Sequence, residues 1–511
     1  MKGYVFIKNT VIMTVTSLIL RAIGMFFRIY LAGEIGSEGI GLYQMIFSVY
    51  VLAATFATTG ISTAVTRLIA ENSSSGRKGE GEIMQKSLLI TSGFALLSVG
   101  IVFFGSDFIA TILFKDQRAT LSLKIMAFSL PFMGFCSCFR GYLIAKRKTM
   151  SPCMSQVLEQ FVRMGVVIAA LTFVGTEDIE KCTAAVLLGD CFAEAFSALM
   201  LYIVYKRDLS KVKTEGAKIS GVENKILKIS LPIMGGKYMS SALHTAENLL
   251  VPNSLNKFSQ KQDGLVFFGD LKGMALPLLF FPASFLSALA TMLIPEISES
   301  YSKGDELTVK SSVSRTLETT LLLSIFAGAC FLVCGDIVGQ VVYKSDSIGY
   351  LLRALAPIVP FMYLESVMTG VLKGLDKQNA MFLYNLVDSV ARIISVIFLV
   401  PQYGTNGFLA VMTVSNIMTS GLCCKTVLKA SGVKMQWTKN VIIPTAVSVG
   451  SVIASRWLFN FIVSTLLKCI VIISFSGLVY LVIYYNRLTR RNKLQVVRAK
   501  QGLFFGKNVL Q

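Results

Sequence analysis

The stretch Asn9–Gly33 reads NTVIMTVTSLILRAIGMFFRIYLAG, and its only charged residues are Arg21 and Arg28. At roughly 1.5 Å per residue, a helix of this length crosses a hydrocarbon core roughly 30 Å thick. The stretch is too long for a cleaved signal peptide, and no small-residue cleavage site follows an uncharged core. It therefore predicts a membrane-spanning helix.

The composition of the whole chain supports this interpretation. The 511 residues are 54% hydrophobic and only 15% charged, with a mean hydropathy of +0.65. Soluble domains contain about 25% charged residues. The composition excludes a soluble multidomain enzyme, a disordered protein and a nucleic-acid-binding domain. The net charge of +20 is expected of a membrane protein, because Lys and Arg collect in cytoplasmic loops.

Fourteen apolar runs are long enough to span a bilayer. They cover residues 9–33, 40–68, 84–114, 119–145, 153–175, 182–205, 227–252, 264–294, 312–342, 349–372, 380–400, 406–428, 441–460 and 464–485. Alternate loops are rich in Lys and Arg, whereas the turns at Glu34–Glu38 and Glu177–Glu180 are acidic. We therefore predict an all-α, multi-pass protein of the cell membrane with fourteen helices and both termini in the cytoplasm.

The chain also repeats itself. Pro131–Met133 and Pro360–Met362 share the sequence PFM, and each is followed by a glycine ten residues after its proline, with a shift of 229 residues. The same shift maps Lys148 onto Lys377, Glu159 onto Asp388 and Arg163 onto Arg392. A shift of 228 maps Gly41 onto Gly269, Thr63 onto Thr291 and Glu71 onto Glu299. We predict two pseudo-symmetric six-helix lobes, residues 1–215 and 216–430, related by an axis along the membrane normal. A helix pair at 431–485 and a basic cytoplasmic tail at 486–511 follow.

Cations inside apolar runs are the candidate functional residues, since each costs at least ~2.5–3.5 kcal/mol at a helix centre unless it is paired or hydrated. Arg21, Gly24 and Arg28 share one helix face, and their run contains no acid. Arg21 therefore faces either a partner acid elsewhere or a wet cavity. Because guanidinium groups bind two phosphate oxygens at once, a cavity here favours a phosphate-bearing substrate.

Lys237 and Lys272 lie in the seventh and eighth runs, which are rich in proline. Lys237 has His244 and Glu247 about two and three turns away, and Lys272 has Asp270 two residues before it. Pro and Gly at membrane depth mark either broken helices that line a cavity or ordinary kinks. We predict Arg21, Arg28, Lys237 and Lys272 as substrate-binding residues, with Gly24 and Glu247 in supporting or gating roles.

The repeat places two arginines near the midplane, each with an acid one turn earlier: Glu159 before Arg163 and Asp388 before Arg392. These are either self-neutralised pairs or elements of a seam between the lobes, with structural or gating roles. Cations nearer the ends of runs are expected to reach the headgroups. They are Lys124, Arg140, Arg353, Arg456 and Lys468.

Motifs for catalysis and cofactors are missing from the sequence. The ten cysteines lie mostly in apolar runs without zinc spacing, and His244 is the only histidine. We find no phosphate-cradling loop, HExxH motif or nucleophile elbow. The prediction is a protein that is not an enzyme and uses no metal or cofactor. A membrane glycosyltransferase is the alternative from another class, and it would need an acid or base near the sugar.

Four stretches carry a family resemblance. They are Leu20–Gly24, Gly39–Met45, Gly60–Ala64 and Ser287–Pro295. With them the chain resembles the stage V sporulation protein B family of the multidrug/oligosaccharidyl-lipid/polysaccharide exporter superfamily, and it is similar to MurJ-type lipid II flippases. The resemblance implies two six-helix lobes around a central cavity and flipping of polyprenyl-pyrophosphate-linked peptidoglycan precursors for the spore cortex.

The resemblance also implies roles for individual residues. Arg21 and Arg28 match the cavity arginines of helix 1, and Lys272 stands where the family has an arginine on helix 8; the family's arginine on helix 2 has no counterpart here. The implied partners are a polyprenyl-linked oligosaccharide, membrane lipids and peptidoglycan-synthesis proteins. Alternatives within the superfamily are a cation-coupled multidrug exporter and an exporter of another polysaccharide lipid intermediate.

Overall fold

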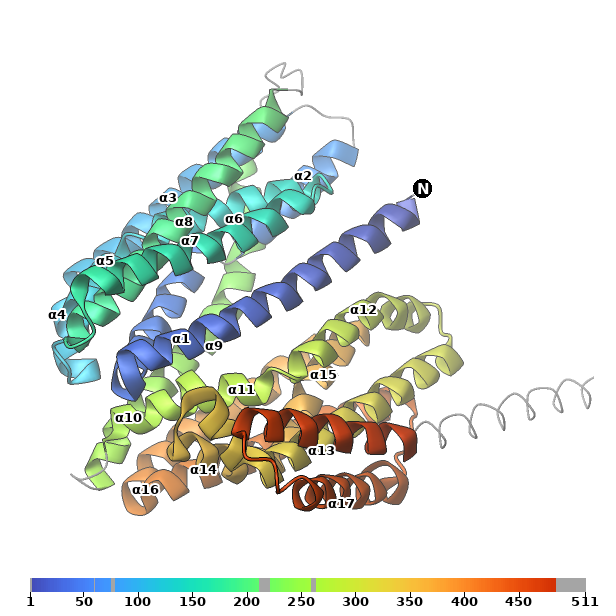
Figure 1. Cartoon of the computed structure of the whole chain (residues 1–511). Helices are drawn as coiled ribbons and strands as arrows, with labels where there is room; N and C mark the ends of the chain where they lie inside the picture. Colours follow the sequence, from blue (N-terminus) through green and yellow to red (C-terminus); the bar gives the residue numbers. More distant parts are fainter. Residues whose placement is uncertain (1, 59, 75–78, 211–220, 259–262, 484–511) are drawn as a thin grey trace, which may run out of the picture. The chain divides into compact units, whose positions relative to one another are not determined.

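The computed structural model describes residues 2–58, 60–74, 79–210, 221–258 and 263–483, and every regular element in these ranges is a helix (Figure 1). This confirms the predicted all-α fold. The whole basic tail, together with Arg77, Lys78 and the loop lysines at 211–218, lies outside the described residues.

The helices follow one another with short connections. They are α1 Lys2–Thr58, α2 Ile61–Ser74, α3 Glu80–Phe104, α4 Ser106–Phe108, η1 Ile109–Phe114, α5 Ala119–Ala127, α6 Leu130–Ala145, α7 Met150–Val174, α8 Ile179–Leu209, α9 Val222–Phe258, α10 Gly264–Phe268, η2 Gly269–Ala275, α11 Leu276–Phe280, α12 Ala283–Ser302, α13 Glu306–Tyr343, α14 Asp346–Leu355, η3 Ala356–Ile358, α15 Val359–Gly374, α16 Gln378–Ser431, η4 Thr438–Ile442 and α17 Ile443–Leu458. A last helix spans Thr465–Ile483.

Two of these elements are pairs of helices joined at a glycine. In α1 the break is at Gly36, with φ 66°, and in α16 it is at Gly404, with φ 59°. Positive φ is readily adopted only by glycine, so the chain turns at these positions. Each break falls between two apolar runs that the sequence separates, 9–33 from 40–68 and 380–400 from 406–428.

The described helices include ten that are long and apolar enough to cross a membrane, or eleven if the bent pair Gly264–Phe280 and Ala283–Ser302 is one span. This confirms a multi-pass membrane protein. The total of fourteen stays a prediction. Helices α1 and α16 each contain two of the predicted runs, and α9, which contains another, is not among the ten.

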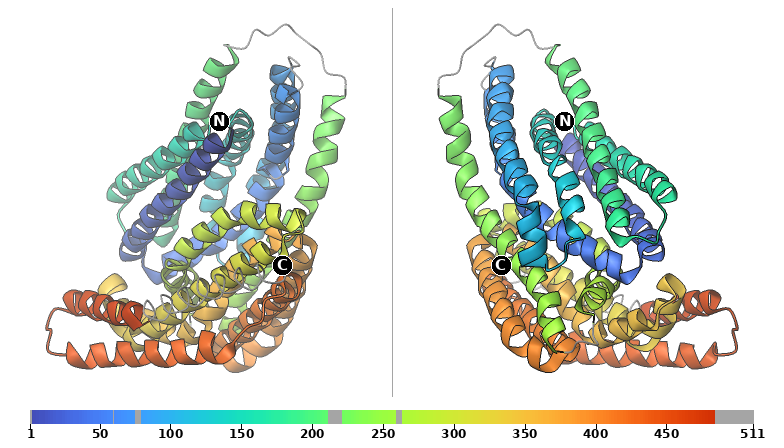
Figure 2. Two further views of the ribbon diagram at one scale, coloured as in Figure 1. Left: turned by 90° about the vertical axis from the view of Figure 1, so that its right-hand side faces the viewer. Right: turned by 90° about the vertical axis from the view of Figure 1, so that its left-hand side faces the viewer.

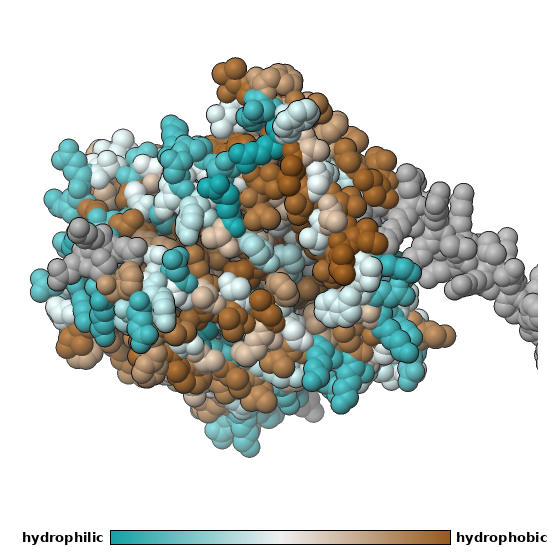
Figure 3. Space-filling view, turned by 90° about the horizontal axis from the view of Figure 1, so that it is seen from below, coloured by the Kyte–Doolittle hydropathy of each residue, from teal (hydrophilic) through white to brown (hydrophobic). Residues whose placement is uncertain are grey.

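Apolar side chains on the surface fit a lipid environment. Phe104, Phe173 and Val463 are 84%, 92% and 96% exposed. Figure 3 shows apolar side chains over much of the face seen from below. Soluble monomers rarely expose so much contiguous apolar surface, so these side chains are expected to face acyl chains.

The chain divides into two compact units, residues 1–305 with 365–427 and residues 306–364 with 428–511. In the first unit, helices α2, α3, α6 and α8 pack around a core that includes Met84, Tyr142 and Leu201. The start of α9 joins this core through Ile226, and α9 continues beside α2 and α1 (Figure 2). The lobe boundaries derived from the repeat remain a prediction.

In the second unit, α17 and the last helix pack on α13. Arg456 Nη2 lies 2.9 Å from Asp336 Oδ2, and the Tyr480 hydroxyl donates to the Leu322 carbonyl over 3.1 Å. Lys468 donates to Asn460 within the hairpin. Arg456 is thus paired with an acid in a partly exposed ion pair, and its position at the headgroups stays a prediction.

The repeat-related glycines Gly41 and Gly269 meet where α1 and η2 cross in the first unit. A methyl group on Gly269 would lie 1.9 Å from the Ser37 carbonyl oxygen, and one on Gly41 would lie 2.2 Å from the Leu265 carbonyl oxygen. Small residues allow helix backbones to approach this closely in membranes. The crossing therefore depends on both glycines.

We predict that Gly269→Ala lowers the thermal stability of the detergent-purified protein by about 1–3 kcal/mol, because the added methyl overlaps backbone. Gly165→Ala is the matched control, since nothing lies within 4 Å of a methyl there and alanine favours a helix. Size-exclusion chromatography after heating measures the fraction of each variant that stays folded. Equal melting temperatures of the two variants would show that the α1 and η2 backbones can move apart at the crossing without loss of stability.

Candidate functional site

A cavity of about 360 Å³ lies against the first part of α1. Its lining consists of Leu20, Arg21, Gly24, Met25 and Arg28 from α1, and Pro277, Phe280, Phe281 and Ser284 from the segment α11–α12. The structure therefore brings the predicted stripe of Arg21, Gly24 and Arg28 together on one wall. The opposite wall is apolar and aromatic.

The second wall is shaped by a break in the backbone. The pair Gly264–Phe280 and Ala283–Ser302 is bent by 59°, and Phe281 and Pro282 form the break. Proline lacks the amide proton that would continue the helix, so a bend here is expected. The predicted interruption of the eighth run thus lies beside the cavity. By contrast, α9 continues through Pro232 and Pro252.

Arg21 and Arg28 present their guanidinium groups without carboxylate partners among the described residues. Arg21 Nη1 donates to Ser287 Oγ over 3.2 Å, and both arginine side chains are exposed. Of the two predicted surroundings for Arg21, a partner acid or a cavity, the structure has the cavity. Most of the donors of the two groups are available to an anionic ligand.

The two lysines predicted to bind substrate are not among the residues lining this cavity. Lys272 lies in η2 and interacts electrostatically with Glu247 and Arg392. Lys237 is exposed on α9. His244 also lies on α9. Its Nδ1 is 3.9 Å from Glu247 Oε2, which is too long for a hydrogen bond.

Arg392 is the centre of a polar network, here named the α9–α16 cluster, formed by Glu247, Asp388, Arg392 and Ser415. Arg392 Nη1 lies 3.0 Å from Glu247 Oε1, and its Nε lies 3.2 Å from Asp388 Oδ2. Ser415 accepts from Arg392 Nε over 2.6 Å and donates to Asp388 over 2.5 Å. Glu365 interacts with the same arginine. The predicted pair of Asp388 and Arg392 therefore has a second acid on α9.

A second network, the α6–α8 cluster, contains Arg140, Glu159, Arg163, Asp190 and Glu194. Arg163 pairs with Glu159 over 3.3 Å and with Asp190 over 2.7 Å. Arg140 Nη2 lies 2.7 Å from Glu159 Oε2 and donates to Ser197 over 3.2 Å. The prediction that Arg140 reaches the headgroups was therefore wrong.

Sequence reasoning missed Asp190 and Glu194. Both lie on α8 in the apolar run 182–205, four residues apart and therefore on one face. Acids inside an apolar run are as informative as cations, and this signal was available. The ion-pair partners of Arg163 lie on α7 and α8, and those of Arg392 lie on α9 and α16, which supports structural roles. A gating role for these residues stays a prediction.

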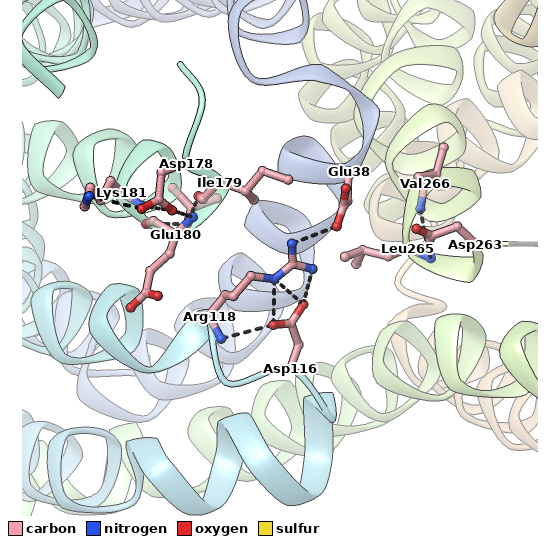
Figure 4. Close-up of polar contacts among 11 residues, drawn as sticks. Glu38, Asp116, Arg118, Asp178, Ile179, Glu180, Lys181, Asp263, Leu265 and Val266 are labelled. Carbon is pink, nitrogen blue, oxygen red and sulfur yellow. Dashed lines mark hydrogen bonds and ion pairs between the residues drawn. The ribbon is translucent and has the colours of Figure 1, made fainter. Parts of the chain in front are cut away.

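Helix ends near the acidic turns are fixed by charged side chains (Figure 4). Arg118 Nη1 lies 2.8 Å from Glu38, and its Nη2 lies 2.7 Å from Asp116. The hydrogen bond to Asp116, reinforced by Glu38, raises the pKa of the Arg118 guanidinium. Asp178 and Asp263 accept hydrogen bonds from backbone amides and cap α8 and α10.

We predict that Arg392→Gln lowers the free energy of unfolding by about 3–5 kcal/mol, because it leaves Asp388 buried without its cation and leaves Glu247 with Lys272 alone. Arg67→Gln is the control, since Arg67 and Glu71 form an exposed pair and its loss has little effect. Thermal melting and transport are measured on both variants. Unchanged melting with lost transport would instead show that Arg392 acts in gating.

Comparison with known proteins defines the family. Residues 6–301 match the family described as polysaccharide biosynthesis protein. Stage V sporulation protein B of Bacillus subtilis (strain 168) is 26% identical over 439 residues, covering 83% of this chain and 84% of the relative. The lipid II flippase MurJ of the same organism is 21% identical over 437 residues, covering 78% of each.

Solved structures share the fold. A lipid II flippase MurJ in an inward closed conformation superposes with a TM-score of 0.72 at 17% identity, covering 93% of this chain and 99% of that one. An inward-facing multidrug resistance MATE family transporter of the MOP superfamily gives a TM-score of 0.60 at 12% identity, covering 83% and 100%. These relatives are transporters or flippases rather than enzymes. The chain belongs to the polysaccharide biosynthesis protein family and is a membrane transporter or flippase.

Proposed function

We propose that the protein flips a polyprenyl-pyrophosphate-linked oligosaccharide, a lipid II-like peptidoglycan precursor, across the cell membrane by alternating access. The observation that carries this proposal is the cavity on α1, where Arg21 and Arg28 have no carboxylate partner among the described residues. Two uncompensated cations in a membrane helix are costly. A ligand with two or more negative charges offsets that cost and uses the forked donors of both arginines.

The form of the cavity supports an amphiphilic anion. Opposite the arginines, Pro277, Phe280 and Phe281 offer an apolar wall. A volume of about 360 Å³ lies at the lower end of the range for small-molecule sites, roughly 300–1,000 Å³. The pyrophosphate and the groups next to it therefore occupy the cavity, and the sugars and the isoprenoid tail extend beyond it.

The relatives support a proposal for the biological role. Stage V sporulation protein B and sporulation protein YkvU of Bacillus subtilis both match about four fifths of this chain. We therefore place the proposed flippase in spore cortex synthesis, with peptidoglycan-synthesis proteins as its partners and both termini in the cytoplasm. Lys237 and Lys272 are proposed to contact the substrate in another conformation.

A cation-coupled multidrug exporter is the second candidate, favoured by the MATE-like fold and by the buried acids of the α6–α8 cluster. Against it, the described residues lining the cavity on α1 include two arginines and no acid. Such a lining repels cationic drugs and attracts phosphates. The two candidates differ in the charge of the substrate that the cavity accepts.

We predict that Arg21→Ala reduces flipping of lipid II in reconstituted vesicles about tenfold or more, since a charge-assisted hydrogen bond contributes roughly 1.5–3 kcal/mol. Arg21→Lys is expected to be impaired less, because lysine keeps the charge and loses the fork. Flipping is measured as the fraction of labelled head groups that become accessible from the opposite leaflet.

Arg67→Ala, an exposed residue outside the cavity, is the control and is expected to flip at the wild-type rate. All variants need equal reconstitution levels. Full lipid II flipping by Arg21→Ala would refute the site. Accumulation of a cationic dye with no movement of lipid II in the wild type would favour the exporter.

A further inference from the structure

The α6–α8 cluster contains more buried acid than base. Glu159, Asp190 and Glu194 are only 9%, 7% and 6% exposed, and they share the two arginines Arg140 and Arg163. With all five groups ionised, the cluster has one uncompensated negative charge. Burying such a charge is far costlier than burying a neutral carboxyl group.

The hydrogen bonds show which acid lacks a partner. Arg140 and Arg163 pair with Glu159, and Arg163 also pairs with Asp190. Glu194 Oε2 is buried and has no hydrogen-bond partner among the described residues. The Nε donor of Arg140 is likewise buried and unpartnered, although Arg140 and Glu194 interact electrostatically. Arg140 Nε, a donor, and Glu194 Oε2, an acceptor, therefore both lack a hydrogen-bond partner within the cluster.

Titratable and charged groups face Glu194 from each helix packed against it. They are Tyr50 on α1, Cys136 and Arg140 on α6, Glu159 and Arg163 on α7, and Asp190 and Cys191 on α8 itself. Tyr43 on α1 faces Asp190 and Arg163 beside them. The tyrosines and cysteines are neutral in this setting and do not supply the missing positive charge.

We propose that Glu194 is a proton-binding site: its carboxyl group holds a proton in this conformation, and release of that proton engages the Nε donor of Arg140. In this state Arg140 is held by Glu159 and Ser197 through Nη2. An ionised Glu194 attracts the guanidinium group and competes with those bonds. Proton occupancy thereby changes the contacts between α6 and its neighbours α7 and α8.

Asp190 and Glu194 have no acidic counterparts at the equivalent positions of the second half. The shift of 229 residues that maps Arg163 onto Arg392 places Thr419 and Cys423 where Asp190 and Glu194 would recur. In the second half Arg392 instead meets Glu247 and Asp388. This proposal goes beyond the proposed function, since it concerns a second ligand and holds for any transported substrate.

Infrared difference spectroscopy of the full-length protein in lipid nanodiscs tests the proton directly. The wild type is expected to show the C=O stretch of a protonated carboxyl group at neutral pH and to lose it in alkali. Glu194→Gln should lack this band, and Glu71→Gln, the same change in an exposed pair, should keep it. No band at neutral pH, or a band unchanged in Glu194→Gln, would overturn the proposal.

Melting as a function of pH gives a second readout that needs no transport assay. If the folded state holds a proton that the unfolded state releases, stability falls as pH rises. Glutamine has the shape of the neutral acid, so Glu194→Gln is expected to fold normally and to flatten this slope. An unfolded Glu194→Gln protein, or an unchanged slope, would contradict the proposal. Neither result bears on whether Arg21 binds lipid II.

Discussion

The cost of placing a charge in hydrocarbon is the constraint on which the rest of the structure depends. Arg163 and Arg392 each meet it with one acid from their own helix and one from a neighbouring helix, within 3.3 Å in each case. Arg21 and Arg28 have no such acid among the described residues and face a cavity. The same physical rule therefore separates arginines that hold helices together from arginines that are available to a ligand.

Glycine residues determine where the backbone can turn and where two helices can touch. Gly36 and Gly404 let long helical segments reverse direction, and Gly41 and Gly269 let two segments cross at backbone contact. The crossing involves positions equivalent in the repeat, as expected where two related copies meet. Proline then bends the segment after Gly269 and gives the cavity its second wall. Charges and backbone breaks together define the candidate site.

The two ionic clusters are built from partly different positions despite the repeat. In the α9–α16 cluster, Lys272 lies close to Glu247 and adds a second cation beside Arg392. In the α6–α8 cluster, three acids share two arginines, and Glu194 keeps an unpartnered oxygen. Glu365 also interacts with Arg392, so each cluster holds three acids and two cations.

Local features of the sequence determined the all-helical membrane fold, the breaks near Gly36 and Gly404, and the shared face of Arg21, Gly24 and Arg28, because apolar length and a period of 3.6 residues act along the chain. The i,i+4 pairs of Arg163 and Arg392 could be predicted from spacing, but only the tertiary structure decided which charges meet across helices. Glu247 and Arg392 are 145 residues apart, so their pairing depends on how helices pack and leaves no local signal. The same holds for Arg140 and Glu159, and for Lys272, which packing placed beside Glu247 instead of in the cavity. These cross-helix partners of buried charges come from distant segments, and packing alone brings them together.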